Sequence, residues 1–282
     1  MRVGYLVGGT LSLLFYKLDR KHIVSTFRWG LEAKIKNKKA VNIIYLLLTA
    51  LVASAVYLIP ESEAINGIVA FGVLEIVGAV EKKNGNNFNK GIKIEKNLSR
   101  KRKIINKNIN DRKVFYETLT LLGKSLIGSF ITPLLIIVFF GNGAAVAYGM
   151  IYFYFDELAH GVGEKILNII FILPSLIGDG LLYLIYICRN KTFKISFKGE
   201  FFQNLFYMPL LNVYILGAYI ETVNFYYFEN YEVVHYIKSY GVYQGKIDEV
   251  ATKDLVTIIY GVAGVAFILF IVIINLNLKF II

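Results

Sequence analysis

The sequence predicts an all-α, polytopic helical membrane protein with about six transmembrane spans and one short re-entrant or interfacial helix. Hydrophobic residues make up 56% of the 282 residues and charged residues only 18%, whereas soluble domains are about one quarter charged. The hydrophobic residues gather in blocks, most of them near the roughly 20 residues that cross a bilayer as a helix. These observations exclude an ordinary soluble enzyme, a disordered chain and a disulfide scaffold. We expect one integral membrane domain over residues 1–282.

Eight hydrophobic blocks supply the expected helices. The first is too short to assign as a span, although its Gly4-x-x-x-Gly8 spacing permits close packing against another helix. Six of the remaining blocks are predicted to cross the membrane. In chain order the blocks are Val3–Phe15, Val41–Ile59, Ala64–Val80, Leu119–Phe140, Ala144–Phe155, Ile166–Ile187, Leu205–Phe228 and Leu255–Leu278.

The positive charges lie between these blocks. Of the 31 Lys and Arg residues, 8 fall in residues 17–39, 12 in residues 81–113 and 4 in residues 189–198. Cytoplasmic loops carry such an excess, so we expect a multi-pass protein of the plasma membrane with these segments inside, on anionic headgroups. The basic cytoplasmic segment 81–113 is predicted to lie on the headgroups as a surface helix. This distribution favours lipid over nucleic acid as the partner of the net charge of +11.

The block Ala144–Phe155 is the short element of the predicted fold. Segments 81–113 and 189–198 both require the cytoplasmic side, yet three blocks separate them, and an odd number of crossings cannot return the chain to the same side. With 12 residues this block is the weakest of the three. It is therefore predicted to be re-entrant or interfacial, which requires burial in protein at membrane depth. A seventh span here is the alternative.

Ionisable residues inside the blocks are the candidate functional residues, because a charge near the bilayer centre costs about 3 kcal/mol or more. Glu75 and Glu221 lie deepest and indicate either an interior polar pocket or a buried ion pair. No metal site is expected, since Cys188 is the single cysteine and the three histidines lie far apart. The full set is Glu75, Lys124, Asp156, Glu157, Asp179 and Glu221.

The order of features along the chain resembles the adenosylcobinamide-phosphate synthase family of cobalamin-biosynthesis membrane proteins. The resemblance covers nearly the whole chain through many short matches in the same order and spacing. The matches are Gly4–Phe15, Arg28-Trp29-Gly30, Val41–Ile59, Glu117-Thr118, Pro133-Leu134, Gly141, Gly143, Tyr148, Asp156 (displaced by one residue), Leu173-Pro174, Asn204 through Gly217, Asn224, Tyr226-Tyr227 and an Asp before the last helix, Asp254.

The chain departs from this family at positions that bear on catalysis. The Gly-Arg-Asp motif of the family has no counterpart in Ile105–Arg112, and its Glu-Asn-x-x-Asp-Gly stretch is replaced by residues 124–129, which contain no carboxylate. The loop with the Ala-Arg-x-Asp-Asp motif is shortened to Gly161–Asn168, and only Asn204 remains of the Ser-Pro-Asn triplet. The fold is therefore better supported than the catalytic activity.

The resemblance implies an ATP-dependent amide-forming ligase that joins cobyric acid to aminopropanol or its phosphate, with ATP and Mg²⁺ as cofactors. Glu117 and Asp156 would then be catalytic, in magnesium binding or acid–base work. The corrinoid substrate would be bound by Tyr148, Asn204, Asn224 and Tyr226.

Two other functions remain open. A relative that has lost its chemistry would act as a membrane sensor or accessory protein, and the family resembled here has such a branch in a membrane protein linked to β-lactamase induction. A small transporter with Glu75 and Glu221 as coupling carboxylates is a weaker alternative, because the sequence shows no inverted repeat.

Overall fold

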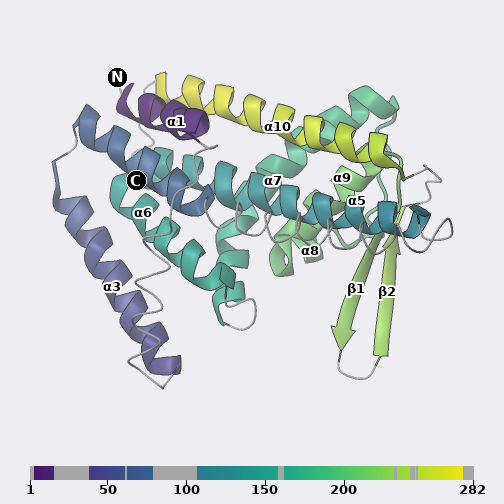
Figure 1. Ribbon diagram of the computed structural model, residues 1–282, viewed down its shortest axis with the longest axis horizontal. Helices are drawn as coiled ribbons and strands as arrows, with labels where there is room; N and C mark the ends of the chain where they lie inside the picture. Colours follow the sequence, from purple (N-terminus) through teal and green to yellow (C-terminus); the bar gives the residue numbers. More distant parts are fainter. Residues whose placement is uncertain are drawn as a thin grey trace. The chain divides into compact units, whose positions relative to one another are not determined.

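A computed structural model describes residues 3–15, 38–60, 62–78, 107–157, 162–231, 234–241, 245 and 247–275 (Figure 1). The chain forms two compact units. The first contains residues 1–83, 128–167 and 266–282, and the second contains residues 84–127 and 168–265. Most of the predicted basic segments 17–39 and 81–113 lies outside the described residues.

In the first unit, α1 (Val3–Phe15) packs closely against the helix formed by residues 63–78. A Cβ atom on Gly4 would lie 1.9 Å from the carbonyl oxygen of Glu63, and one on Gly8 would lie 2.2 Å from that of Gly67. The backbones meet with no room for a side chain, which confirms the close packing predicted from the glycine spacing.

The first unit also contains α3 (Lys38–Leu58) and α6 (Thr132–Glu157), which follows the π-helix η1 (Ser125–Ile131). Gly141 interrupts α6 with non-helical angles, φ 76° and ψ −165°. Gly141 therefore marks a kink within α6. The kink is packed inside the unit, because Asn142 is buried and its amide donates to Asn66 Oδ1 over 2.7 Å.

The part of α6 after this kink runs antiparallel along α3 (Figure 1). At one end, a Cβ on Gly143 would touch the carbonyl oxygen of Ala53 at 2.9 Å. Further along, the Tyr45 hydroxyl donates to the Met150 carbonyl over 3.0 Å, and the Tyr45 and Tyr154 rings stack at 4.1 Å. The second half of α6 thus lies along a helix long enough to cross the membrane, which favours a crossing over the re-entrant or interfacial helix predicted for Ala144–Phe155.

The second unit is built around α9 (Pro209–Ile220), ten of whose residues are buried. Around it lie α5 (Lys107–Lys124), α8 (Phe201–Tyr207), most of α7 (Val162–Asn190) and the first part of α10 (Glu249–Asn275). Strands β1 (Phe225–Tyr231) and β2 (Val234–Tyr240) form an antiparallel hairpin with Phe225 opposite Tyr240 and Tyr231 opposite Val234.

Four helices of the described residues are long and apolar enough to cross a membrane: Ala40–Leu58, Val114–Tyr154, Gly163–Asn190 and Glu249–Ile274. A row of exposed side chains on α3, namely Ile43, Leu47 and Leu51, is 59–66% exposed and suits contact with lipid. The protein is therefore a helical membrane protein, as predicted. Residues 63–78 are helical and coincide with most of a fifth predicted span.

The predicted span Leu205–Phe228 is wrong. The chain breaks at Met208, α9 begins at Pro209 and ends at Ile220, and residues from Phe225 onward form a strand. A helix of 12 residues is about 18 Å long, well short of the roughly 30 Å hydrocarbon core. The hydrophobic composition of this block instead reflects burial in the centre of the second unit.

Candidate functional site

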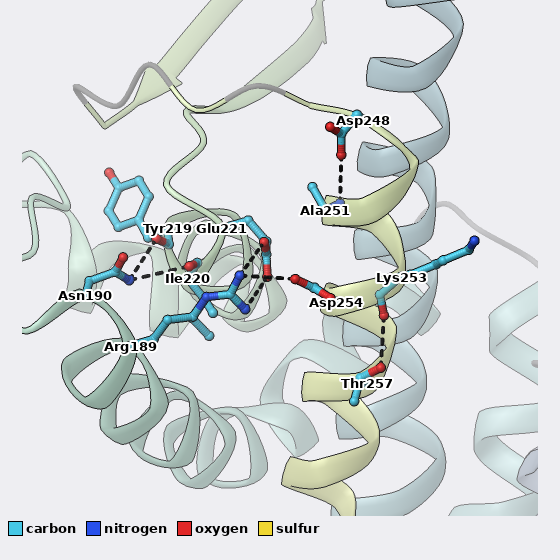
Figure 2. A network of polar contacts seen from close by, with 10 residues as sticks. All are labelled: Arg189, Asn190, Tyr219, Ile220, Glu221, Asp248, Ala251, Lys253, Asp254 and Thr257. Atoms are coloured by element: carbon cyan, nitrogen blue, oxygen red, sulfur yellow. Dashed lines mark hydrogen bonds and ion pairs between the residues drawn. The ribbon is translucent and has the colours of Figure 1, made fainter.

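Two polar arrangements and one isolated buried carboxyl stand out in the second unit. The first arrangement is an ion-pair network that joins the end of α7, the end of α9 and the start of α10 (Figure 2). Arg189 Nη1 lies 2.8 Å from Glu221 Oε1, and Nη2 donates to Glu221 Oε2 over 3.0 Å. The same Nη2 lies 3.4 Å from Asp254 Oδ2. The pair of Arg189 and Glu221 therefore consists of one charge-assisted hydrogen bond and one close ionic contact.

Burial differs sharply among the three groups. The Glu221 side chain is 4% exposed, whereas those of Arg189 and Asp254 are 39% and 50% exposed. Burial raises the pKa of the Glu221 carboxyl above its usual range, while the positive charge of Arg189 opposes that rise. Of the two alternatives for Glu221, a polar pocket or a buried ion pair, the structure has the ion pair.

Beside this ion-pair network, further hydrogen bonds stabilise the end of α9 and the start of α10. The Asn190 amide donates to the carbonyl oxygens of Tyr219 and Ile220 at 3.4 Å each, which satisfies two main-chain acceptors at the end of α9 (Figure 2). Asp248 accepts from the first amides of α10, those of Val250 and Ala251, at 3.0 Å. Asp248 is therefore the acidic residue at the start of the last helix. Asp254, matched to that position by the resemblance, lies further along α10 and binds Arg189.

The second arrangement brings α5 to the start of β1. The Tyr116 hydroxyl donates to the Asn224 carbonyl oxygen over 2.5 Å. Its ring meets those of Phe225 and Tyr226 edge-on, at 6.0 and 6.2 Å between centroids. Glu117 is the next residue on α5 and is half-buried, and Tyr226 is 41% exposed. Two predicted site positions, 224 and 226, therefore meet at Tyr116, and the third, Glu117, is its neighbour in the chain. We call Tyr116, Glu117, Asn224 and Tyr226 the Tyr116 cluster.

Asn204, a predicted substrate-binding residue, is buried in the protein core. It is 6% exposed, and its amide donates to Asn212 Oδ1 over 3.2 Å. The Asn212 amide in turn donates to the Phe201 carbonyl over 2.9 Å. These bonds join α8 to α9 across the break at Met208, so Asn204 holds the two short helices together.

The two remaining predicted residues, Tyr148 and Asp156, belong to the first unit. Tyr148 is 2% exposed, its hydroxyl donates to the Gly128 carbonyl, and its ring lies 5.7 Å from that of Tyr152. Asp156 lies in the last turn of α6, and its side chain is outside the described residues. Glu75 of this unit, a deep carboxylate in the sequence, accepts a hydrogen bond from Ser12 over 3.2 Å.

The isolated carboxyl is that of Asp179, which the sequence marks only as one of several charged residues in hydrophobic blocks. Asp179 is 3% exposed and Ser175, one helical turn earlier on α7, is fully buried. Neither oxygen of the Asp179 carboxyl, nor the Ser175 hydroxyl, has a hydrogen-bond partner among the described residues. The four-residue spacing of a serine and an aspartate within one hydrophobic block is the sequence signal that could have selected this pair.

Comparison with protein-family models, curated proteins and solved structures finds no match to this chain. The functional assignment therefore depends on the chemistry of the residues described above and on the order of motifs along the sequence.

Proposed function

We propose that the protein is a membrane-embedded, corrinoid-handling protein of the adenosylcobinamide-phosphate synthase type, with the Tyr116 cluster as part of its ligand site. The observation that carries the proposal is the meeting of α5 and β1 at Tyr116. It joins Tyr116, the residue before Glu117 on α5, to Asn224 and Tyr226, although more than 100 residues separate the two segments. Exposed aromatic rings beside polar groups suit a macrocycle whose rim carries amides.

The ATP and Mg²⁺ implied by the resemblance have no residues assigned to them in this proposal. Among the described residues, no three His, Cys, Asp or Glu side chains gather as ligands. The two carboxylates that do lie together, Glu221 and Asp254, are both bound to Arg189. No step of the reaction is derived through these cofactors. The chemistry proposed for the Tyr116 cluster is limited to binding the substrate and to proton transfer at Glu117.

A second candidate is an accessory or sensor protein that binds a corrinoid without chemical conversion. This function is favoured by the use of Asn204 and Tyr148 as hydrogen-bonding groups within the fold. Side chains committed to core contacts are not free to contact a substrate in this conformation. Binding at the Tyr116 cluster is common to both candidates.

One assay separates the candidates. The purified protein in detergent is mixed with cobyric acid, aminopropanol phosphate, ATP and magnesium, with an active synthase run in parallel. Corrinoid product detected by mass spectrometry is the result expected for the ligase. A shift of the corrin absorption spectrum without product would establish the accessory function. Neither product nor spectral shift would contradict both candidates.

Glu117→Gln is expected to abolish turnover while leaving the protein folded and inserted in the membrane. The substitution keeps the size of the side chain but removes its proton-accepting carboxylate. Glu249→Gln is the matched control, because Glu249 is 78% exposed and forms an ion pair with Lys253 in the same helix. Turnover that survives in Glu117→Gln would refute the role of Glu117, and equal losses in both variants would mean a general structural effect.

A further inference from the structure

Asp179 lies within a hydrophobic helix that is long enough to cross the membrane. The helix covers Gly163–Asn190, and Asp179 is about 16 Å along it from Asn190. That distance is about half of the roughly 30 Å hydrocarbon core. An ionisable residue at this depth is costly unless it is neutralised, and such residues commonly serve a function.

Asp179 belongs to the buried face of α7. Phe171, Ser175, Leu182 and Tyr186 follow the same helical spacing and are all buried. Ser175 and Asp179 are the two groups of this row with polar atoms that lack a hydrogen-bond partner among the described residues. At a spacing of four residues, their Cβ atoms are about 5–6 Å apart, so the two side chains are direct neighbours.

No charge on the described part of the chain compensates Asp179. Neither oxygen of its carboxyl has a hydrogen-bond partner among the described residues. The cations nearest in sequence, Lys165 and Arg189, lie near the two ends of α7. An ionised carboxylate in such surroundings would cost several kcal/mol, on the order of the penalty for an unpaired buried ion.

A proton is the ligand that this geometry fits best. It needs one oxygen atom, whereas metal cations bind several oxygens at once, and the described residues supply only the carboxyl of Asp179 and the hydroxyl of Ser175. We propose that Asp179 and Ser175 form a reversible proton-binding site in the interior of the second unit. One proton from water converts the carboxylate to a neutral acid, whose O–H then has the Ser175 oxygen as a neighbouring acceptor. The site is independent of the proposed corrinoid function.

Infrared spectroscopy of the purified protein tests this proposal directly. A protonated carboxyl gives a carbonyl stretch above the amide I band, which an ionised carboxylate lacks. At neutral pH the wild type is expected to show this band, Asp179→Asn to lose it, and Ser175→Ala to shift it as the hydrogen bond changes. Transfer to D₂O is expected to move the band to lower frequency, since the proton exchanges with solvent. Glu249→Gln serves as the control and leaves the band unchanged.

Three results would overturn the proposal. Identical spectra of the wild type and Asp179→Asn in this region would mean that Asp179 is ionised. A band that does not move after long incubation in D₂O would mean that the proton is fixed and not reversibly bound. A band that appears only when sodium is replaced by choline would identify a sodium ion as the ligand in place of the proton.

Discussion

Arg189→Met is expected to lower the free energy of unfolding by about 2–4 kcal/mol, because it leaves Glu221 buried without a counter-charge. The Glu221 side chain is 4% exposed and Arg189 contacts both of its oxygens. Met retains most of the aliphatic length of Arg, so the loss reports mainly on charge. The measurement is the midpoint of thermal unfolding in detergent.

Two variants make this result specific. Lys194→Met removes an exposed cation from the segment that follows Arg189, and it should change stability by less than about 0.5 kcal/mol. Glu221→Gln in the Arg189→Met background removes the uncompensated charge and should recover at least half of the loss. Equal effects of the two single Met variants, or no recovery in the double variant, would show that the network does not stabilise the fold.

Gly8→Ala is expected to lower the free energy of unfolding by about 2–3 kcal/mol, because one added methyl group forces two backbones apart. The new Cβ atom would lie 2.2 Å from the Gly67 carbonyl oxygen, which cannot rotate away as a side chain would. The midpoint of thermal unfolding again reports the effect. Gly9→Ala is a close control on the same helix, since its Cβ would meet Phe267 at an acceptable 3.4 Å. Equal stability of these two variants would contradict the close packing of α1.

The sequence predicts those features that depend on local pattern. The spacing of Gly4 and Gly8 indicates a close helix contact because only residues without a side chain allow it. Four of the predicted spans coincide with long hydrophobic helices, since about 20 apolar residues have few other stable structures.

Features that depend on partners could not be predicted in this way. Hydrophobic composition does not distinguish a lipid-facing span from a short helix buried on all sides, so the block Leu205–Phe228 was assigned wrongly. The signals against a span were Pro209, which begins α9, and the polar residues Asn212 and Glu221. The sequence left a polar pocket and a buried ion pair open for Glu221, because its partner, Arg189, lies 32 residues away in the chain.

The residues of the predicted site also depend on partners that are distant in the chain. Sequence order relates Glu117 to Asn224 and Tyr226 only through the resemblance, and the contact through Tyr116 becomes visible when α5 and β1 are placed. Asn204 looked available for a ligand because its partner, Asn212, lies on the next helix. The sequence does not distinguish Asp179 from the other ionisable residues in hydrophobic blocks. What sets it apart is that its carboxyl has no hydrogen-bond partner among the described residues, and a sequence does not reveal this.

The distribution of cations and the packing of helices lead to different paths of the chain through the membrane. The count of cations in loops requires that residues 144–155 do not cross. The packing of α6 along α3 aligns these residues with a membrane-spanning helix for almost the full length of α3. We give the packing more weight, because it consists of specific contacts from Gly143 to Tyr154, whereas the count depends on the four cations of residues 189–198.

Cysteine labelling in intact cells tests this account most directly, with Cys188 replaced by serine. Leu58 is 79% exposed at the end of α3, and Lys165 is exposed just after α6. If residues 142–157 cross the membrane beside α3, a cysteine at Leu58 will react with an impermeant thiol reagent outside the cell. A cysteine at Lys165 will then react only after the membrane is permeabilised. Labelling of both positions from the outside would contradict the crossing and restore a re-entrant helix.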